Sequence, residues 1–219
     1  CRHEIHHAPK LSRCAATVGV MGRSRFHGEI YGIGTEAGVR VVVGHWTDSP
    51  LGEFTDVMVQ FARGHRLLLA PTEDVREFVT ATYTFDEVYL TPVAFTRHGD
   101  QVQLEADDLR VSIELGKPTF LGRLLHLLPS KVTTAPWFCT VSDPIARVVL
   151  RGVRTRGSAG NDRREYYGAR HQHRILTATA SWRGEDLGAL TPVTPPVTFG
   201  FGSTPAAPSV TSITTTIDS

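Results

Sequence analysis

The chain has 219 residues, of which 41% are hydrophobic and 21% are charged, a balance typical of a globular protein with a sizeable core. Its 23 basic and 22 acidic residues give a formal net charge of +1, so no overall positive field attracts nucleic acid. No apolar run approaches the roughly 20 residues that cross a bilayer, and the N-terminal residues lack the apolar stretch of a signal peptide. We therefore expect a protein that binds neither nucleic acid nor a membrane.

The three cysteines, Cys1, Cys14 and Cys139, are an odd number and widely spaced, which favours a reducing compartment over a disulfide framework. We accordingly expect a cytoplasmic location. Residues 1–20 contain several histidines but no apolar periodicity. They are expected to be a disordered leader or a wrongly assigned start. Residues 21–219 are expected to form one domain, because composition changes little along them.

The first strands and the first helix are indicated between residues 39 and 80. Residues 39–43 are a continuous β-branched run that ends at the turn sequence 47–50, TDSP. Residues 54–61 read as a second strand in which Asp56 and Val57 point to opposite faces, because strand side chains alternate. Thr72 is predicted to be the N-cap of a short helix, since two acidic residues and an apolar stripe follow it.

The remaining elements are mostly strands joined by turns. Strands are predicted over 83–95, 101–105, 109–115, 145–155 and 174–182, and a second short amphipathic helix between Pro118 and Pro129. From Thr191 on, the chain is rich in Pro and Thr and is expected to wrap the domain in extended form before it frays. The pattern predicts a mainly β (α+β) fold in which a curved antiparallel sheet closes into a cone or barrel.

No cofactor or metal is expected from the motifs. Phosphate-binding glycine loops, hydrolase elbows and paired metal-binding cysteines do not occur in the sequence. His171 and His173 stand at strand spacing and could share one face. Without further ligands they are interpreted as a solvated strand start in preference to a metal site.

One segment carries a more specific signal. Residues 44–57, GHWTDSPLGEFTDV, combine a strand end, a Ser-Pro turn, a glycine and an aromatic residue two positions before an acid. This pattern resembles the acetoacetate decarboxylase-like superfamily. Further pieces follow in the order expected of that family, namely 164–168 (REYYG), 177–182 (TATASW), 187–188 (LG) and 199–200 (FG). The resemblance covers roughly residues 26–217.

The resemblance implies a carboxylate in the cavity of a β-cone, and Asp56 falls on the position of that acid. We expect Asp56 and Glu53 to be the candidates for acid–base chemistry, and Trp46, Tyr89 and Val93 to contact the substrate. The family's decarboxylases form a Schiff base through a lysine that follows a proline, whereas the matching segment 91–95, TPVAF, places Val93 there. A valine cannot form an imine.

Several functions remain open. The leading hypothesis is a family member without the catalytic lysine that binds a small keto or carboxylic acid, or an apolar metabolite, with Asp56 as acid or base. Asp56 could instead be a surface carboxylate, and Glu53 an exposed turn residue. A lipocalin-like binding protein is the alternative from another class. The apolar helix around Leu124 could also serve as the interface of a homo-oligomer.

Overall fold

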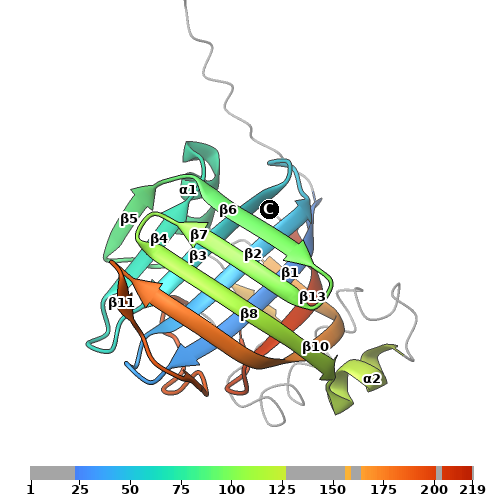
Figure 1. Ribbon diagram of the computed structural model, residues 1–219. Coiled ribbons are helices and arrows are strands. Elements are labelled where there is room, and N and C mark those ends of the chain that lie inside the picture. Colours follow the sequence, from blue (N-terminus) through green and yellow to red (C-terminus); the bar gives the residue numbers. More distant parts are fainter. Residues whose placement is uncertain (1–22, 127–155, 159–163, 201–203, 219) are drawn as a thin grey trace, which may run out of the picture.

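The structure is a computed structural model that describes residues 23–126, 156–158, 164–200 and 204–218. Its strands form one curled sheet, accompanied by two short helices (Figure 1). The predicted mainly β fold with a curved sheet and few helices is therefore confirmed. The predicted leader over 1–20 and the predicted strand over 145–155 lie outside the described residues.

The strands are β1 (Arg23–Thr35), β2 (Arg40–Asp48), β3 (Phe54–Gln60), β4 (Arg66–Ala70), β5 (Glu87–Leu90), β6 (Val93–His98), β7 (Gln101–Ala106), β8 (Leu109–Pro118), β9 (Arg156–Ser158), β10 (Arg164–Trp182), β11 (Glu185–Asp186), β12 (Leu190–Thr191) and β13 (Ser209–Asp218). The helices are α1 (Glu73–Thr80) and α2 (Phe120–His126). Neither of these described helices is long and apolar enough to span a membrane.

The main path of the sheet runs β5-β4-β3-β2-β1-β13-β10-β8-β7-β6, with β9, β11 and β12 attached at its sides. Neighbouring strands are antiparallel except β4 and β5, which pair in parallel because α1 connects them. The final strand β13 lies between β1 and β10, near the middle of the sheet. The expectation that the C-terminal region frays is therefore wrong for residues 209–218.

Alternation along the strands buries both faces of the central sheet. In β2, Val41 and Val43 join one apolar cluster and Val42 joins another. The first cluster, here called the inner core, brings side chains of β1–β4 together with those of β7 and β8. The second, the outer core, unites the opposite face of β1–β4 with β13, α1 and the segment 193–199. The sheet thus curls around the inner core, while α1 covers part of its outer face.

Edge strand β6 closes the curl. Phe95 stacks on the imidazole of His45 with ring centroids 4.0 Å apart, and its ring also lies 5.7 Å from that of Tyr31. Arg97 donates from Nη1 to both carboxylate oxygens of Glu29, at 3.0 and 2.8 Å. The Tyr31 hydroxyl donates to the same carboxylate at 2.5 Å. These contacts fasten the last strand of the path over β1 and β2, strands that lie near its centre.

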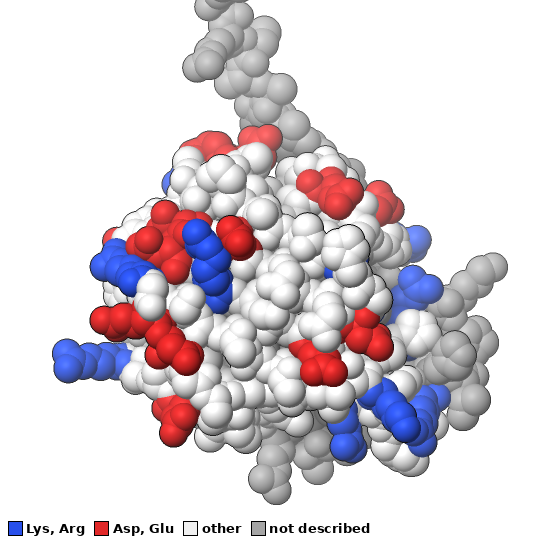
Figure 2. Space-filling view, viewed as in Figure 1, with Lys and Arg blue, Asp and Glu red and all other residues white. Residues whose placement is uncertain are grey.

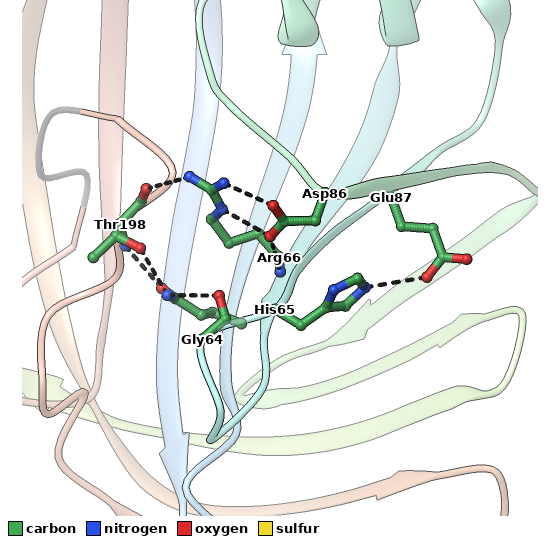
Figure 3. A network of polar contacts seen from close by, with 7 residues as sticks. Gly64, His65, Arg66, Asp86, Glu87 and Thr198 are labelled. Atoms are coloured by element: carbon green, nitrogen blue, oxygen red, sulfur yellow. Dashed lines mark hydrogen bonds and ion pairs between the residues drawn. The ribbon is translucent and has the colours of Figure 1, made fainter.

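A polar network holds the segment 193–199, which packs in the outer core, in place (Figure 3). Arg66 of β4 donates from Nε and Nη2 to the two carboxylate oxygens of Asp86, at 3.0 and 2.8 Å, and from Nη1 to the carbonyl of Thr198. Gln60 donates to the Thr198 hydroxyl at 2.7 Å and accepts from its backbone N–H at 2.8 Å. This network holds the segment 193–199 against β3 and β4.

Most predicted elements are present, with one break that has a clear cause. α1 begins after Thr72, whose hydroxyl accepts from the Val75 backbone N–H, as the capping pattern predicts. The strand predicted over 83–95 is instead two strands, β5 and β6, separated at Thr91 and Pro92. Proline has no N–H to donate, which favours a break at this point.

On the face shown in Figure 2, acidic and basic side chains are interspersed around a broad uncharged area.

Replacing Glu29 by Gln should weaken the closure by β6. The amide keeps the shape of the carboxylate but loses its charge-assisted bond with Arg97, so the free energy of unfolding should fall by about 2 kcal/mol. Urea denaturation followed by circular dichroism measures the change. Glu105→Gln is the control, since this exposed carboxylate lies 3.4 Å from Arg110 Nε and should contribute less than about 0.5 kcal/mol. Equal stability of the two variants would contradict this role of Glu29.

Candidate functional site

Asp56 is a buried carboxyl on the outer face of β3. Its side chain is only 3% exposed, and it accepts a hydrogen bond from Trp46 Nε1 at 3.0 Å. Gly44 is the residue paired with Asp56 on β2. A Cβ at Gly44 would lie 2.6 Å from Asp56 Oδ1 and 2.8 Å from Trp46 Nε1. Glycine at this position is therefore what leaves room for the hydrogen bond between the indole and the carboxyl.

The Asp56 carboxyl lies in a small pocket of about 40 Å³ between the sheet and α1. The missing side chain at Gly44 helps to open it, because Ile30, Gly44 and Asp56 form one row across β1, β2 and β3. Most of the wall is aromatic or aliphatic. It consists of Phe26, Ile30, Val42, Gly44, Trp46, Phe54, Met58, Phe78, Val79, Thr82, Tyr83, Tyr167, Thr215 and Ile217. We refer to this space as the Asp56 pocket.

Two further polar features line the Asp56 pocket. The Thr215 side chain is buried, and its hydroxyl has no hydrogen-bond partner among the described residues. A buried hydroxyl without a partner is costly and points to a missing group beside it. The hydroxyls of Tyr83 and Tyr167 lie 2.7 Å apart and bridge the end of α1 to β10. The pocket therefore combines a largely apolar wall with a carboxyl and the hydroxyls of Thr215, Tyr83 and Tyr167.

Burial raises the pKa of Asp56 to about 7, because the apolar surroundings disfavour the charged form; the Trp46 hydrogen bond acts in the opposite direction. Protonated and ionised forms are consequently both populated near neutral pH. The protonated form donates a hydrogen bond to a carbonyl oxygen, and the ionised form accepts a proton. A carboxyl of this kind is suited to general acid–base work.

The structure brings Asp56 and Trp46 together but separates the other predicted site residues from them. Glu53 is exposed and lines an open hollow beside Val93. Val93 and Tyr89 pack against the inner core, on the opposite face of the sheet from Asp56, and the Tyr89 hydroxyl donates to Glu87 at 2.8 Å. The expected cavity inside the cone is also displaced: the inner core fills the curl, and the Asp56 pocket lies outside it.

Sequence reasoning missed Thr215, Tyr83 and Tyr167 as site residues. Thr215 pairs with Phe26 on one side and with Tyr167 on the other, so three distant segments meet only through the register of β1, β13 and β10. Of these three residues, only Tyr167 lies in a segment that carries the family resemblance, 164–168, and no role was predicted for it.

The one described lysine, Lys117, is exposed at the end of β8 and does not line the pocket. No group of three potential metal ligands occurs among the described residues.

The pH dependence of stability should show the raised pKa of Asp56. The folded state holds its proton more tightly than the unfolded chain, so the contribution of Asp56 is fully present below about pH 4 and is lost as pH rises to about 7. The loss should total a few kcal/mol. Asp56→Asn should remove it, because the neutral amide still accepts from Trp46.

Urea unfolding of both proteins between pH 4 and pH 8 measures this difference. Asp100→Asn, in the exposed turn between β6 and β7, is the matched control and should retain the wild-type profile. Parallel profiles for wild type and Asp56→Asn would show that Asp56 has an ordinary pKa.

Comparisons with known proteins give only distant similarity. No family model matches the chain, and no curated protein does. Among solved structures, the chain is similar to an acetoacetate decarboxylase from Legionella pneumophila, with 9% identity over 90% of this chain and 84% of that one, at a TM-score of 0.44. It is also similar to a protein assigned as AttH from Nitrosomonas europaea, with 12% identity over 90% of this chain and 52% of that one, at a TM-score of 0.33.

Proposed function

We propose that the protein binds a small, neutral, mainly apolar molecule with a carbonyl or hydroxyl group in the Asp56 pocket, and that Asp56 exchanges a proton with it. One observation carries the proposal: a carboxyl with a pKa near 7 lies in a largely apolar pocket that Thr215 also lines, and the buried Thr215 hydroxyl has no hydrogen-bond partner among the described residues. A titratable group with a strongly shifted pKa in a cavity is a typical feature of functional sites.

The electrostatics favour a neutral ligand. A carboxylate ligand would place a second negative charge beside Asp56 in apolar surroundings, which is unfavourable unless one of the two is protonated. The volume of about 40 Å³ limits the ligand to a few non-hydrogen atoms in the described arrangement. A short ketone meets both conditions, because its oxygen can accept from Thr215 or from protonated Asp56.

The chemistry that these groups support is proton transfer at the carbon beside the carbonyl. The ionised Asp56 takes that proton, the electrons move onto the carbonyl oxygen, and a hydroxyl donor of the pocket wall stabilises the oxygen. Return of a proton from Asp56 to the same carbon regenerates the ketone. The cycle needs no oxidant, reductant or covalent intermediate.

We further propose that the chain is a member of the acetoacetate decarboxylase-like superfamily that lacks the catalytic lysine. The order of motifs from residue 44 to residue 200 and the curled β sheet support this assignment. The lining of the Asp56 pocket supports the absence of imine chemistry, because no lysine occurs among the described residues that form it.

Deuterium exchange tests the proposed proton transfer. Wild-type protein in D₂O should accelerate exchange of the protons beside the carbonyl of 2-butanone, followed by ¹H NMR. Asp56→Asn should slow the exchange by roughly 100-fold or more, because the general base is removed. Thr215→Val should weaken 2-butanone binding, whereas Thr177→Val, a change on the exposed part of β10, should have no effect. Exchange that persists in Asp56→Asn would refute the role of Asp56.

A non-catalytic binding protein is the second candidate, and the largely apolar wall of the Asp56 pocket favours it. The same experiment separates the two functions. Saturable binding of 2-butanone that Asp56→Asn and Thr215→Val weaken, without exchange above the buffer rate, would assign binding alone.

Incubation with acetoacetate and borohydride should leave every lysine unmodified. An imine requires a neutral amine in a desolvated or cation-rich pocket, and Lys117 is exposed to solvent. Peptide mass spectrometry detects a trapped imine as a stable secondary amine. Stoichiometric labelling of one lysine, with release of CO₂ that is abolished by replacing that lysine, would contradict the proposal.

A further inference from the structure

A second hollow lies at the closure of the curled sheet, on the face opposite the Asp56 pocket. It has a volume of about 360 Å³ and is lined by His27, Glu29, His45, Phe95, Arg97 and Arg170, together with the Ser212 hydroxyl. These side chains come from five strands, β1, β2, β6, β10 and β13. We call this space the Arg97 hollow. Nothing in the proposed function uses it.

The acidic group of the Arg97 hollow is fully engaged. Glu29 accepts from the Tyr31 hydroxyl, from Arg97 Nη1 and from the Ser212 hydroxyl at 3.1 Å. Burial alone would raise the pKa of Glu29, but the hydrogen bond from Tyr31 and the charge of Arg97 outweigh it and lower the pKa. Glu29 is therefore ionised and neutralises one of the two arginines.

The second arginine is not balanced. Arg170 is exposed at the rim of the hollow and has no carboxylate partner among the described residues. The only carboxylate among the described lining residues is Glu29. The Arg97 hollow thus carries an excess of one positive charge.

His45 adds a neutral donor. Its Nδ1 lies 2.9 Å from the hydroxyl of Thr55, and burial lowers the pKa of the imidazole, so the ring is neutral at pH 7. Thr55 is buried, and donation from its hydroxyl to Nδ1 satisfies both groups. In that arrangement the ring proton is on Nε2, which has no partner among the described residues.

We propose that the Arg97 hollow is a binding site for a small oxyanion. The excess positive charge of Arg170, the guanidinium of Arg97 and the His45 Nε2–H supply donors around one space, and oxyanions are the ligands that such donors recognise. The rigid stack of His45 on Phe95 holds one donor in place. The site is separate from the Asp56 pocket and does not rest on the function proposed for it.

Isothermal titration calorimetry at low ionic strength tests this site with inorganic phosphate, sulfate and acetate as the probes. Wild-type protein should bind at least one of them saturably with a stoichiometry of one. Arg170→Gln should weaken the binding roughly tenfold, as expected for loss of one charge-assisted contact. His45→Phe keeps the stack on Phe95 but removes the donor, and should weaken it by a similar factor. Arg63→Gln, an exposed arginine in the turn between β3 and β4, gives the same change in net charge and should leave the affinity unchanged.

The pattern among the probes identifies the ligand chemistry. Tighter binding of phosphate and sulfate than of acetate assigns a tetrahedral oxyanion, and the reverse order assigns a carboxylate. Arg170→Gln keeps the test valid if His45→Phe does not fold, since Arg170 is exposed. Absence of saturable binding of all three anions would overturn the proposal. Equal weakening by Arg63→Gln and Arg170→Gln would also overturn it, because the effect would then be one of net charge alone.

Discussion

The packing of β6 over β1 and β2 is the interaction on which the rest of the structure depends. Phe95 covers the rings of His45 and Tyr31, and Arg97 pairs with Glu29. This closure turns an open sheet into a curl whose interior is filled by the inner core. The Asp56 pocket lies outside this filled interior, under α1 on the outer face, and the Arg97 hollow lies at the closure itself.

The Asp56 pocket contains two buried polar groups that lower the stability of the fold. A carboxyl at 3% exposure, with its pKa raised to about 7, is unfavourable for stability at neutral pH. The surroundings accommodate it through the Trp46 indole and the absence of a side chain at Gly44. The buried hydroxyl of Thr215 adds a second unfavourable group to the same wall. A ligand that forms hydrogen bonds in this pocket would explain why the chain keeps these two unfavourable groups there.

Local patterns predicted most of the fold, because strand alternation and helix capping are local. The faces of β3 and the N-cap Thr72 follow directly from residue spacing. The central position of β13 could not be predicted, since pairing between strands so distant in sequence has no local signal. For the same reason the site was predicted only in part. Asp56 and Trp46 lie on one hairpin, whereas Thr215 lies in the pocket only because β13 pairs with β1 and β10.

The central claim is that Asp56 titrates near neutral pH and contacts a small neutral ligand. The most direct measurement is a ¹³C NMR titration of protein labelled at the aspartate carboxyl carbon, with the Asp56 resonance assigned from Asp56→Asn. We predict a midpoint near pH 7 and a change in both the midpoint and the chemical shift when 2-butanone is added. A midpoint near pH 4 that 2-butanone does not alter would contradict the claim.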